Sequence, residues 1–120
     1  MNNQFVVVGA YGTILTSPDG INWTSRTSGT TQWLLGIIYA NSQFVVVGDN
    51  GIILISPNGI TWTRCSSGTT QHLYGITYAS SQFIAVGWNG TILTSPDGIN
   101  WTRHASGTKG WLEGVACVDI

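Results

Sequence analysis

Short apolar runs alternate with polar, glycine-containing segments along the whole chain. The first run is residues 5–8 (FVVV), which a Gly-x-x-Gly segment at residues 9–12 stops, and the second is residues 13–16. A third run spans residues 21–26, and a fourth covers residues 34–39. Such runs of β-branched and aromatic residues between turn residues indicate strands, and no segment has helical spacing. The pattern therefore predicts an all-β chain.

The four runs recur three times at a fixed spacing of 39 residues. The segment that begins at Gln4 returns at Gln43 and Gln82 without insertion or deletion. Periods of this length are typical of propeller blades, solenoids and helical arrays. We therefore predict one repeat domain over residues 1–120, divided into the repeats 2–40, 41–79 and 80–120.

Two folds are built from four-stranded repeats of about this length. A β-trefoil closes three of them as a monomer, whereas a β-propeller uses four or more blades. Residues 5–8 are apolar on both faces, and Ile14 and Leu15 are apolar neighbours. Strands with one wet face alternate, whereas these strands need cover on both sides, as sheets stacked between other sheets have. We predict a β-propeller with three four-stranded blades per chain, and a monomeric β-trefoil is the alternative.

A serine, an acid or amide, a glycine and a tryptophan recur in the same turn of each repeat. The residues concerned are Ser17, Asp19, Gly20, Trp23, Ser56, Asn58, Gly59, Trp62, Ser95, Asp97, Gly98 and Trp101. This pattern resembles the Asp-box (BNR-like) repeat of sialidases, sortilin-type receptors and photosystem II assembly-factor-like propellers. The usual box is Ser-x-Asp-x-Gly-x-x-Trp, so the motif is one residue shorter here, and Asn58 replaces the acid in the second copy. The resemblance implies a structural turn between the third and fourth strands of a blade, with the tryptophan in the core, and no activity by itself.

This placement of the box implies an order of strands within each blade. Residues 34–39 become the innermost strand, so the chain begins on a second strand and ends on an innermost one, residues 112–117. Three blades cannot close a ring, and an open arc would expose two apolar blade faces. We therefore expect the ring to be completed by head-to-tail homo-oligomerisation, with residues 112–117 closing onto an N-terminal blade. A homodimer gives six blades and a homotrimer gives nine.

The composition of the chain argues against two classes of binding partner. Charged residues make up 8% of the chain and the net charge is −1, so we expect no nucleic acid and no anionic membrane as a partner. No apolar run approaches the roughly 18 residues of a membrane helix, and residues 1–4 lack the features of a signal peptide, which leaves the compartment unassigned. Cys65 and Cys117 fall on different strands of the repeat, and we expect free thiols.

Groups suited to catalysis are sparse. Asp19 and Asp97 are turn residues, which leaves no carboxylate pair for glycoside hydrolysis. The histidines have no second His or Cys at metal-ligand spacing. A sialidase-like site needs clustered arginines, whereas these lie one per repeat on the outermost strand: Arg26, Arg64 and Arg103. We expect no enzyme activity, no cofactor and no metal site.

The copies differ most at two connections that share the rim opposite the box turns. Trp33, His72 and Trp111 occupy the connection into the innermost strand. The following hairpin carries the pairs Ala10-Tyr11, Asp49-Asn50 and Trp88-Asn89. Aromatic rings beside amides suit a stacked glycan, or a protein ligand. Trp33 and Trp111 have the alternative role of wedges between blades, whereas Trp88, at a hairpin tip, is expected to have less to pack against.

We therefore predict a non-enzymatic binding module with a Trp-rich face. Its candidate ligand-binding residues are Tyr11, Trp33, Asp49, His72, Trp88, Asn89 and Trp111. The alternative is a purely structural, self-assembling propeller fragment that has no ligand.

Overall fold

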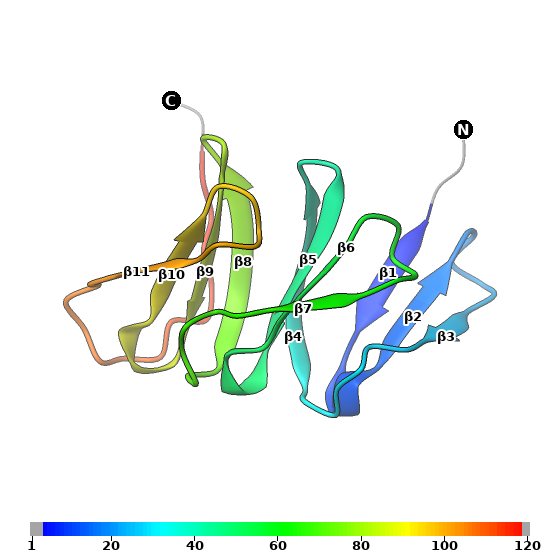
Figure 1. Ribbon diagram of the computed structural model, residues 1–120, viewed down its shortest axis with the longest axis horizontal. Coiled ribbons are helices and arrows are strands. Elements are labelled where there is room, and N and C mark those ends of the chain that lie inside the picture. The colour runs from blue at the N-terminus through cyan, green and yellow to red at the C-terminus, as the bar shows by residue number, and fades with distance from the viewer. Residues whose placement is uncertain (1–3, 119–120) are drawn as a thin grey trace.

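The computed structural model describes residues 4–118, which form three antiparallel sheets (Figure 1). The first sheet contains β1 (Phe5–Val8), β2 (Ile14–Ser17) and β3 (Thr24–Arg26). The second contains β4 (Leu34–Ala40), β5 (Gln43–Gly48), β6 (Ile53–Ser56) and β7 (Thr63–Cys65). The third contains β8 (Leu73–Ala79), β9 (Gln82–Gly87), β10 (Ile92–Ser95) and β11 (Thr102–His104). The prediction of an all-β chain is confirmed.

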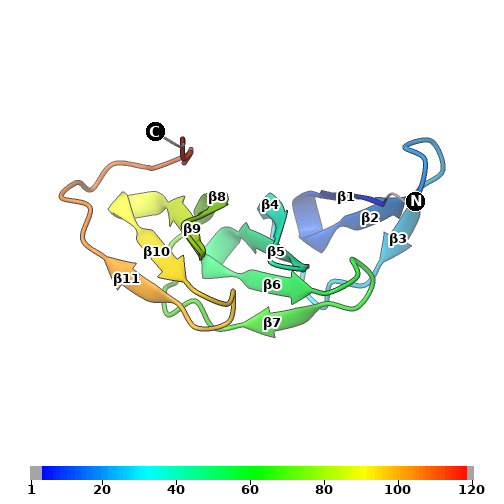
Figure 2. The same cartoon turned by 90° about the horizontal axis from the view of Figure 1, so that it is seen from above.

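The three sheets stand side by side in a fan-shaped arc. Figure 2 shows β4 and β8 on the inner side of the arc and β3, β7 and β11 on its outer side. Sequential strands are neighbours in every sheet, as in a meander. None of the sheets formed by residues 4–118 closes into a barrel, so the β-trefoil alternative is wrong.

The sheets do not coincide with the sequence repeats. Each four-stranded sheet consists of the fourth strand of one repeat followed by the first three strands of the next repeat. The second and third sheets have four strands, whereas the first has three and lacks the strand that corresponds to β4 and β8. The strand predicted at residues 112–117 is not assigned as a strand within residues 4–118, although the N–H of Leu112 donates to the carbonyl oxygen of Gly87 at 2.9 Å. The segment nevertheless lies beside β8. A Cβ atom on Gly75 would lie 2.9 Å from the carbonyl oxygen of Glu113, and one on Gly36 would lie 3.1 Å from that of Tyr74.

The hydrophobic core consists of two layers, one in each gap between neighbouring sheets. The first layer contains Ile14, Leu34, Val46, Ile52 and Leu54, with Val6 and Val8 at its edge. The second contains Val45, Val47, Ile53, Leu73, Phe83, Ala85 and Leu93. Because successive residues of β5 point to opposite faces, this strand contributes to both layers. The two-faced apolar pattern of the sequence thus reflects a sheet covered on both sides.

The third strand of each repeat is shorter than predicted. It was expected over residues 21–26 but begins at Thr24, because the N–H groups of Ile21 and Asn22 donate to the carboxylate of Asp19 and belong to the turn. Trp62 and Trp101 are partly buried and pack at the edges of the two core layers. Trp23 is 41% exposed, because no sheet covers its side of the first sheet.

Candidate functional site

Each Gly-x-x-Gly segment forms a single 3₁₀ turn at the end of the sheet opposite the box turns. These turns are η1 (Ala10–Gly12), η2 (Asp49–Gly51) and η3 (Trp88–Gly90). The middle residue of each turn is in the left-handed region, with φ of 58° at Tyr11, 57° at Asn50 and 56° at Asn89. A Cβ atom on the closing glycine of each turn would collide with a backbone carbonyl of the following Ser-Gly-Thr loop. The glycines therefore fix the backbone, while the two central side chains remain free to vary.

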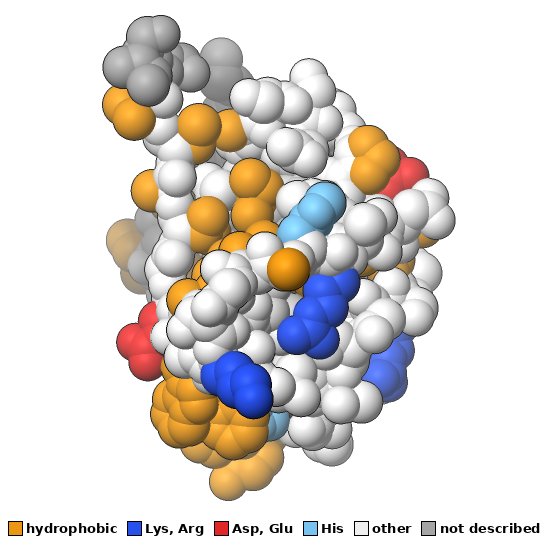
Figure 3. Space-filling view, turned by 90° about the vertical axis from the view of Figure 1, so that its left-hand side faces the viewer, with side chains coloured by type: hydrophobic (Ala, Val, Ile, Leu, Met, Phe, Trp, Pro, Cys, Tyr) orange, Lys and Arg blue, Asp and Glu red, His pale blue; other side chains and the backbone are white. Residues whose placement is uncertain are grey.

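The variable side chains of these turns meet those of the connections into the inner strands. We name Tyr11, Trp33, His72, Trp88 and Trp111 the aromatic rim. Tyr11 and Trp33 lie edge to face, with ring centroids 5.7 Å apart. Trp88 lies between His72 at 4.6 Å and Trp111 at 4.8 Å. Figure 3 shows hydrophobic side chains gathered at the lower end of the third sheet, the end at which η3 lies.

Exposure within the aromatic rim differs from the prediction. Trp88 was expected to have the least to pack against, but it is half-buried between two rings. Tyr11 is 74% exposed, Trp111 is 61% exposed and Trp33 is 46% exposed, so each of these three presents a larger open face than Trp88. The sequence could not show this order, because it depends on which ring lies over which in space.

Polar groups lie directly beside the aromatic rim. The N–H of Asn50 donates to Nδ1 of His72 at 2.9 Å, and the side-chain amide of Asn50 donates to Oε1 of Gln32 at 2.7 Å. Oδ1 of Asp49 lies 3.3 Å from Nδ1 of His72. Asn89 is exposed at the tip of η3. The structure thus brings the predicted residues together as neighbouring pairs around one end of the fan.

One polar atom of the aromatic rim lacks a partner. Nε1 of Trp88 is buried, and within residues 4–118 no group accepts its hydrogen. A buried donor that is left unpaired costs about 1–3 kcal/mol. An acceptor can reach this nitrogen and recover that cost only when a side chain beside it moves, because its surface is buried in the single chain.

The box turns lie at the opposite end of the sheets and are closed by local hydrogen bonds. In the first repeat, Oγ of Ser17 accepts from the N–H of Gly20 at 2.7 Å, and Oδ1 of Asp19 accepts from the N–H groups of Ile21 at 2.8 Å and Asn22 at 2.9 Å. Asn58 uses its amide oxygen in the same way, at 2.9 Å and 3.0 Å. The turn therefore needs an acceptor at this position and does not need a charge.

In the first and third repeats, where this acceptor is an aspartate, the turn nonetheless stabilises its negative charge. Hydrogen bonds from the backbone of Asn22 and Ile21, and then from the side chains of Asn22 and Ser17, hold the pKa of Asp19 well below its usual range. The pKa of Asp97 is lowered in the same way, first by the backbone N–H groups of Asn100 and Ile99. Burial, and then the charge on Asp97, raise the pKa of the Cys65 thiol. Both Cys65 and Cys117 are free thiols.

These lowered pKa values predict an acid-sensitive contribution to stability. A carboxyl group whose pKa is lower in the folded state stabilises the fold above its unfolded pKa of about 3.9, and the contribution is lost as pH falls through the interval below that value. The double variant Asp19→Asn/Asp97→Asn copies the second repeat, so it should fold at pH 7 and lose less stability than the wild type between pH 4 and pH 2. Urea unfolding at several pH values measures this difference. Parallel losses in the two proteins would contradict the assignment.

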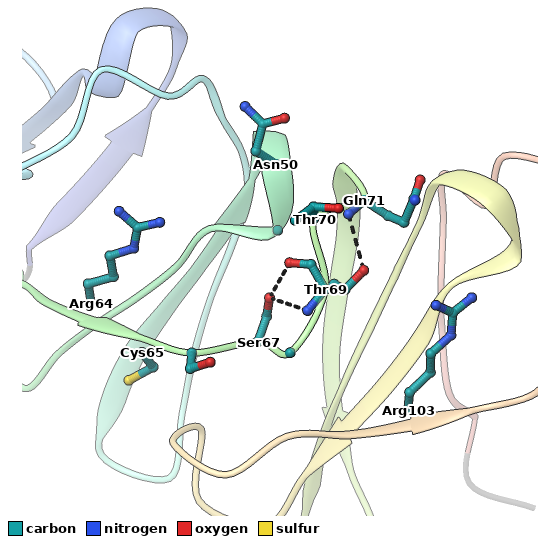
Figure 4. Close-up of a pocket in the computed structure, with 11 residues that line it drawn as sticks. Asn50, Arg64, Cys65, Ser67, Thr69, Thr70, Gln71 and Arg103 are labelled. Atoms are coloured by element: carbon teal, nitrogen blue, oxygen red, sulfur yellow. Dashed lines mark hydrogen bonds between the residues drawn. The ribbon is translucent and has the colours of Figure 1, made fainter.

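Sequence reasoning missed a set of grooves on the outer side of the sheets. The largest, of about 780 Å³, follows the loop of residues 66–71 and is lined by Arg64, Arg103, Asn50 and Gln71 among others. Figure 4 shows Arg64 and Arg103 on either side of this loop, which Ser67 and Thr69 close with hydrogen bonds. Equivalent grooves of about 640 Å³ and 620 Å³ follow the matching loops of the first and third repeats. Within the described residues, neither Arg64 nor Arg103 forms a side-chain hydrogen bond or an ion pair. The recurring Ser-Gly-Thr motif marked the loops, but their position between arginines of neighbouring sheets is a tertiary property.

The described part of the chain contains neither a metal-binding cluster nor a membrane-spanning helix. No group of three or more His, Cys, Asp or Glu side chains lies close enough to hold a metal ion among residues 4–118. Nor does this part contain a helix with the length and apolar character needed to cross a membrane. Comparison of the chain with family models and with curated proteins returns no match.

Proposed function

We propose that the chain is a non-enzymatic β-propeller module that binds a glycan through its aromatic rim. Its working form is a ring completed by further copies of the chain. The observation that carries the ligand is the contiguous group of His72, Trp88 and Trp111, in which the most exposed ring lies beside a buried and unpartnered indole N–H.

The chemistry of this group suits a sugar. Flat aromatic faces stack on the apolar C–H face of a pyranose, while amides and N–H groups bind its hydroxyls. Trp111 supplies an open face, and Trp88 supplies a donor that needs an acceptor. Asn89 and Gln32 add amide groups at neighbouring places on the same end of the fan. A binding site of this kind needs no catalytic group, and Asp49 offers a single carboxylate beside the rim where glycoside hydrolysis uses two.

A glycan array followed by calorimetric titration of the best ligand tests this proposal. Trp111→Ala and Trp88→Ala should each weaken binding by about tenfold or more, equivalent to about 1.4 kcal/mol. Ile99→Ala is the matched control, because Ile99 is 50% exposed but lies on the box turn at the opposite end. Unchanged affinity in both tryptophan variants would contradict the aromatic rim. Loss of binding in Arg64→Ala or Arg103→Ala alone would place the ligand in the outer groove instead.

A structural, self-assembling fragment is the second candidate function. The observation that favours it is the pair of unfinished edges, since the first sheet lacks an inner strand and residues 112–118 have no sheet of their own. A stable ring that binds no member of the array would favour this function over glycan binding.

A further inference from the structure

We propose that residues 112–118 of one copy become the missing inner strand of the β1–β2–β3 sheet of the next copy, in one defined register. This inference rests on the ring of the proposed function and specifies how it closes. Four independent features of the internal contacts between sheets carry it.

The first feature is the register, which is the same in both complete sheets. Leu34 pairs with Gly48, Ile37 with Val46 and Tyr39 with Phe44, and each pair recurs 39 residues later as Leu73 with Gly87, Ile76 with Ala85 and Tyr78 with Phe83. The same offset applied once more places Leu112 opposite Gly9, Val115 opposite Val7 and Cys117 opposite Phe5 of the partner chain. The side chains of the internal pairs face each other, since the Tyr39–Phe44 and Tyr78–Phe83 ring centroids are both 4.7 Å apart.

The second feature is the exposure of the outer sheets. Phe5 is 49% exposed and Val7 is 41% exposed, whereas their equivalents in the third repeat, Phe83 and Ala85, are fully buried. At the other end of the arc, Ile84 and Ile92 are half-buried, whereas the corresponding residues of the second sheet are fully buried. Figure 3 shows hydrophobic side chains along this uncovered face. Placing the first sheet of one copy on the third sheet of another would repeat the packing of the two internal layers.

The third feature is a hydrogen bond that links each sheet to the box turn of the next. Nε2 of Gln4 donates to the carbonyl oxygen of Asn58 at 2.9 Å, and Nε2 of Gln43 donates to that of Asp97 at 2.6 Å. Gln82 holds the same position in the third repeat, and the carbonyl of Asp19 is the equivalent acceptor in the first. A Cβ atom on Gly59 or Gly98 would lie 2.6 Å or 2.8 Å from Nε2 of the glutamine of the preceding sheet, whereas one on Gly20 would meet only Cε2 of Phe5 at 4.0 Å. Gln82 of one copy thus matches Asp19 of the next.

The fourth feature is a backbone hydrogen bond that connects ring closure with the aromatic rim. The N–H of Asp49 donates to the carbonyl of Trp33 at 2.9 Å, and the N–H of Trp88 donates to that of His72 at 2.8 Å. The same offset pairs the N–H of Ala10 in one copy with the carbonyl of Trp111 in another. Trp111 would then lie against Ala10 of that copy, in the place that His72 takes beside Trp88, which brings the aromatic rim up to the seam. Ring closure would therefore also change the surroundings of Trp111.

The partner must be a second molecule. Figure 1 and Figure 2 place β1 and the C-terminal segment at opposite ends of the arc, so the segment of one chain does not reach its own first sheet. Because each copy offers one open end of each kind, the contact is head-to-tail and closes when the number of copies completes the circle.

Oxidative cross-linking tests the register. In a Cys65→Ser background, Phe5→Cys should form a disulfide with Cys117 of the neighbouring chain, because directly opposed residues have Cβ atoms about 4.5–5.5 Å apart. Oxidised glutathione serves as the oxidant, and non-reducing gels and native mass spectrometry should show covalent species of two or three chains. Val6→Cys in the same background is the matched control, since this residue points to the other face of β1 and should not cross-link.

A second variant tests the same register if Phe5→Cys fails to fold. Cys117→Tyr restores the tyrosine that faces phenylalanine in both internal pairs, and it should tighten the ring about fivefold at each seam, as measured by dilution in mass photometry. Equal cross-linking of Phe5→Cys and Val6→Cys, or looser assembly in Cys117→Tyr, would overturn the register. A wild-type chain that is monomeric at every concentration of a series rising in 100-fold steps to roughly millimolar would overturn ring closure itself. Glycan binding by such a monomer would leave the ligand of the proposed function standing, so the two failures are distinguishable.

Discussion

Replacing Gly51 by alanine is expected to destabilise the protein by about 3–5 kcal/mol. Gly51 closes η2 with φ of 74°, a conformation that costs alanine free energy by itself. The added Cβ atom would also collide with the carbonyl oxygen of Thr69 and lie 2.9 Å from Oγ of Ser67. These atoms belong to a loop that is held by its own hydrogen bonds, so they cannot move away without breaking them.

Gly68 provides the matched control for this variant. Its φ is 80°, close to that of Gly51, but a Cβ atom there would meet nothing within 4 Å. Gly68→Ala should therefore cost only the conformational penalty, about 1 kcal/mol. Urea unfolding followed by tryptophan fluorescence gives both values. Similar losses in the two variants would show that the left-handed backbone, and not the contact with the loop, decides the cost.

Replacing Phe83 by alanine is expected to cost about 3–5 kcal/mol, while the same change at Phe5 should cost about 1 kcal/mol or less in the monomer. The two phenylalanines occupy the same position of the repeat. Phe83 is fully buried between the second and third sheets and packs against Tyr78 and Trp101, at centroid distances of 4.7 Å and 6.5 Å. Phe5 is 49% exposed because no sheet covers its side of β1.

The measurement is urea unfolding at a protein concentration where native mass spectrometry shows single chains. Under these conditions Phe5→Ala is the internal reference for Phe83→Ala, because it removes the same atoms at the same position of the repeat. Equal costs at the two positions in a monomeric sample would mean that the first sheet is covered within the single chain, against the exposure seen here. At concentrations where rings form, the cost of Phe5→Ala should rise towards that of Phe83→Ala.

The repeat and the strand content could be predicted from local properties of the sequence. A period of 39 residues, apolar runs such as Phe5–Val8 and the Gly-x-x-Gly turns are all visible along the chain, because strand and turn preferences depend on near neighbours. The requirement for cover on both faces was also readable, since successive residues of a strand point to opposite sides. The first residue of the third strand could not be predicted, because the carboxylate of Asp19 holds Ile21 and Asn22 in the turn.

The candidate ligand-binding residues were predictable as a group but not as a surface. Variation between copies singled out positions such as Trp88 and Trp111, because a repeat keeps what its fold needs and varies elsewhere. Which of these rings is open was decided by contacts between segments distant in sequence, and these left Trp88 sandwiched and Trp111 exposed. The grooves beside Arg64 and Arg103 were missed for the same reason, since each is formed by a loop of one sheet and a strand of the next.

The sequence by itself determined the repeating unit, its strands and turns, and the acceptor that each box turn requires. Those features arise from hydrogen bonds and side-chain spacing within a few residues. Only the tertiary structure decided which copy of each residue is buried, because Phe5 and Phe83 hold the same position of the repeat and only Phe83 is covered by a neighbouring sheet. Burial is a property of neighbours in space, so equivalent positions of the three repeats acquire different environments according to their place in the arc.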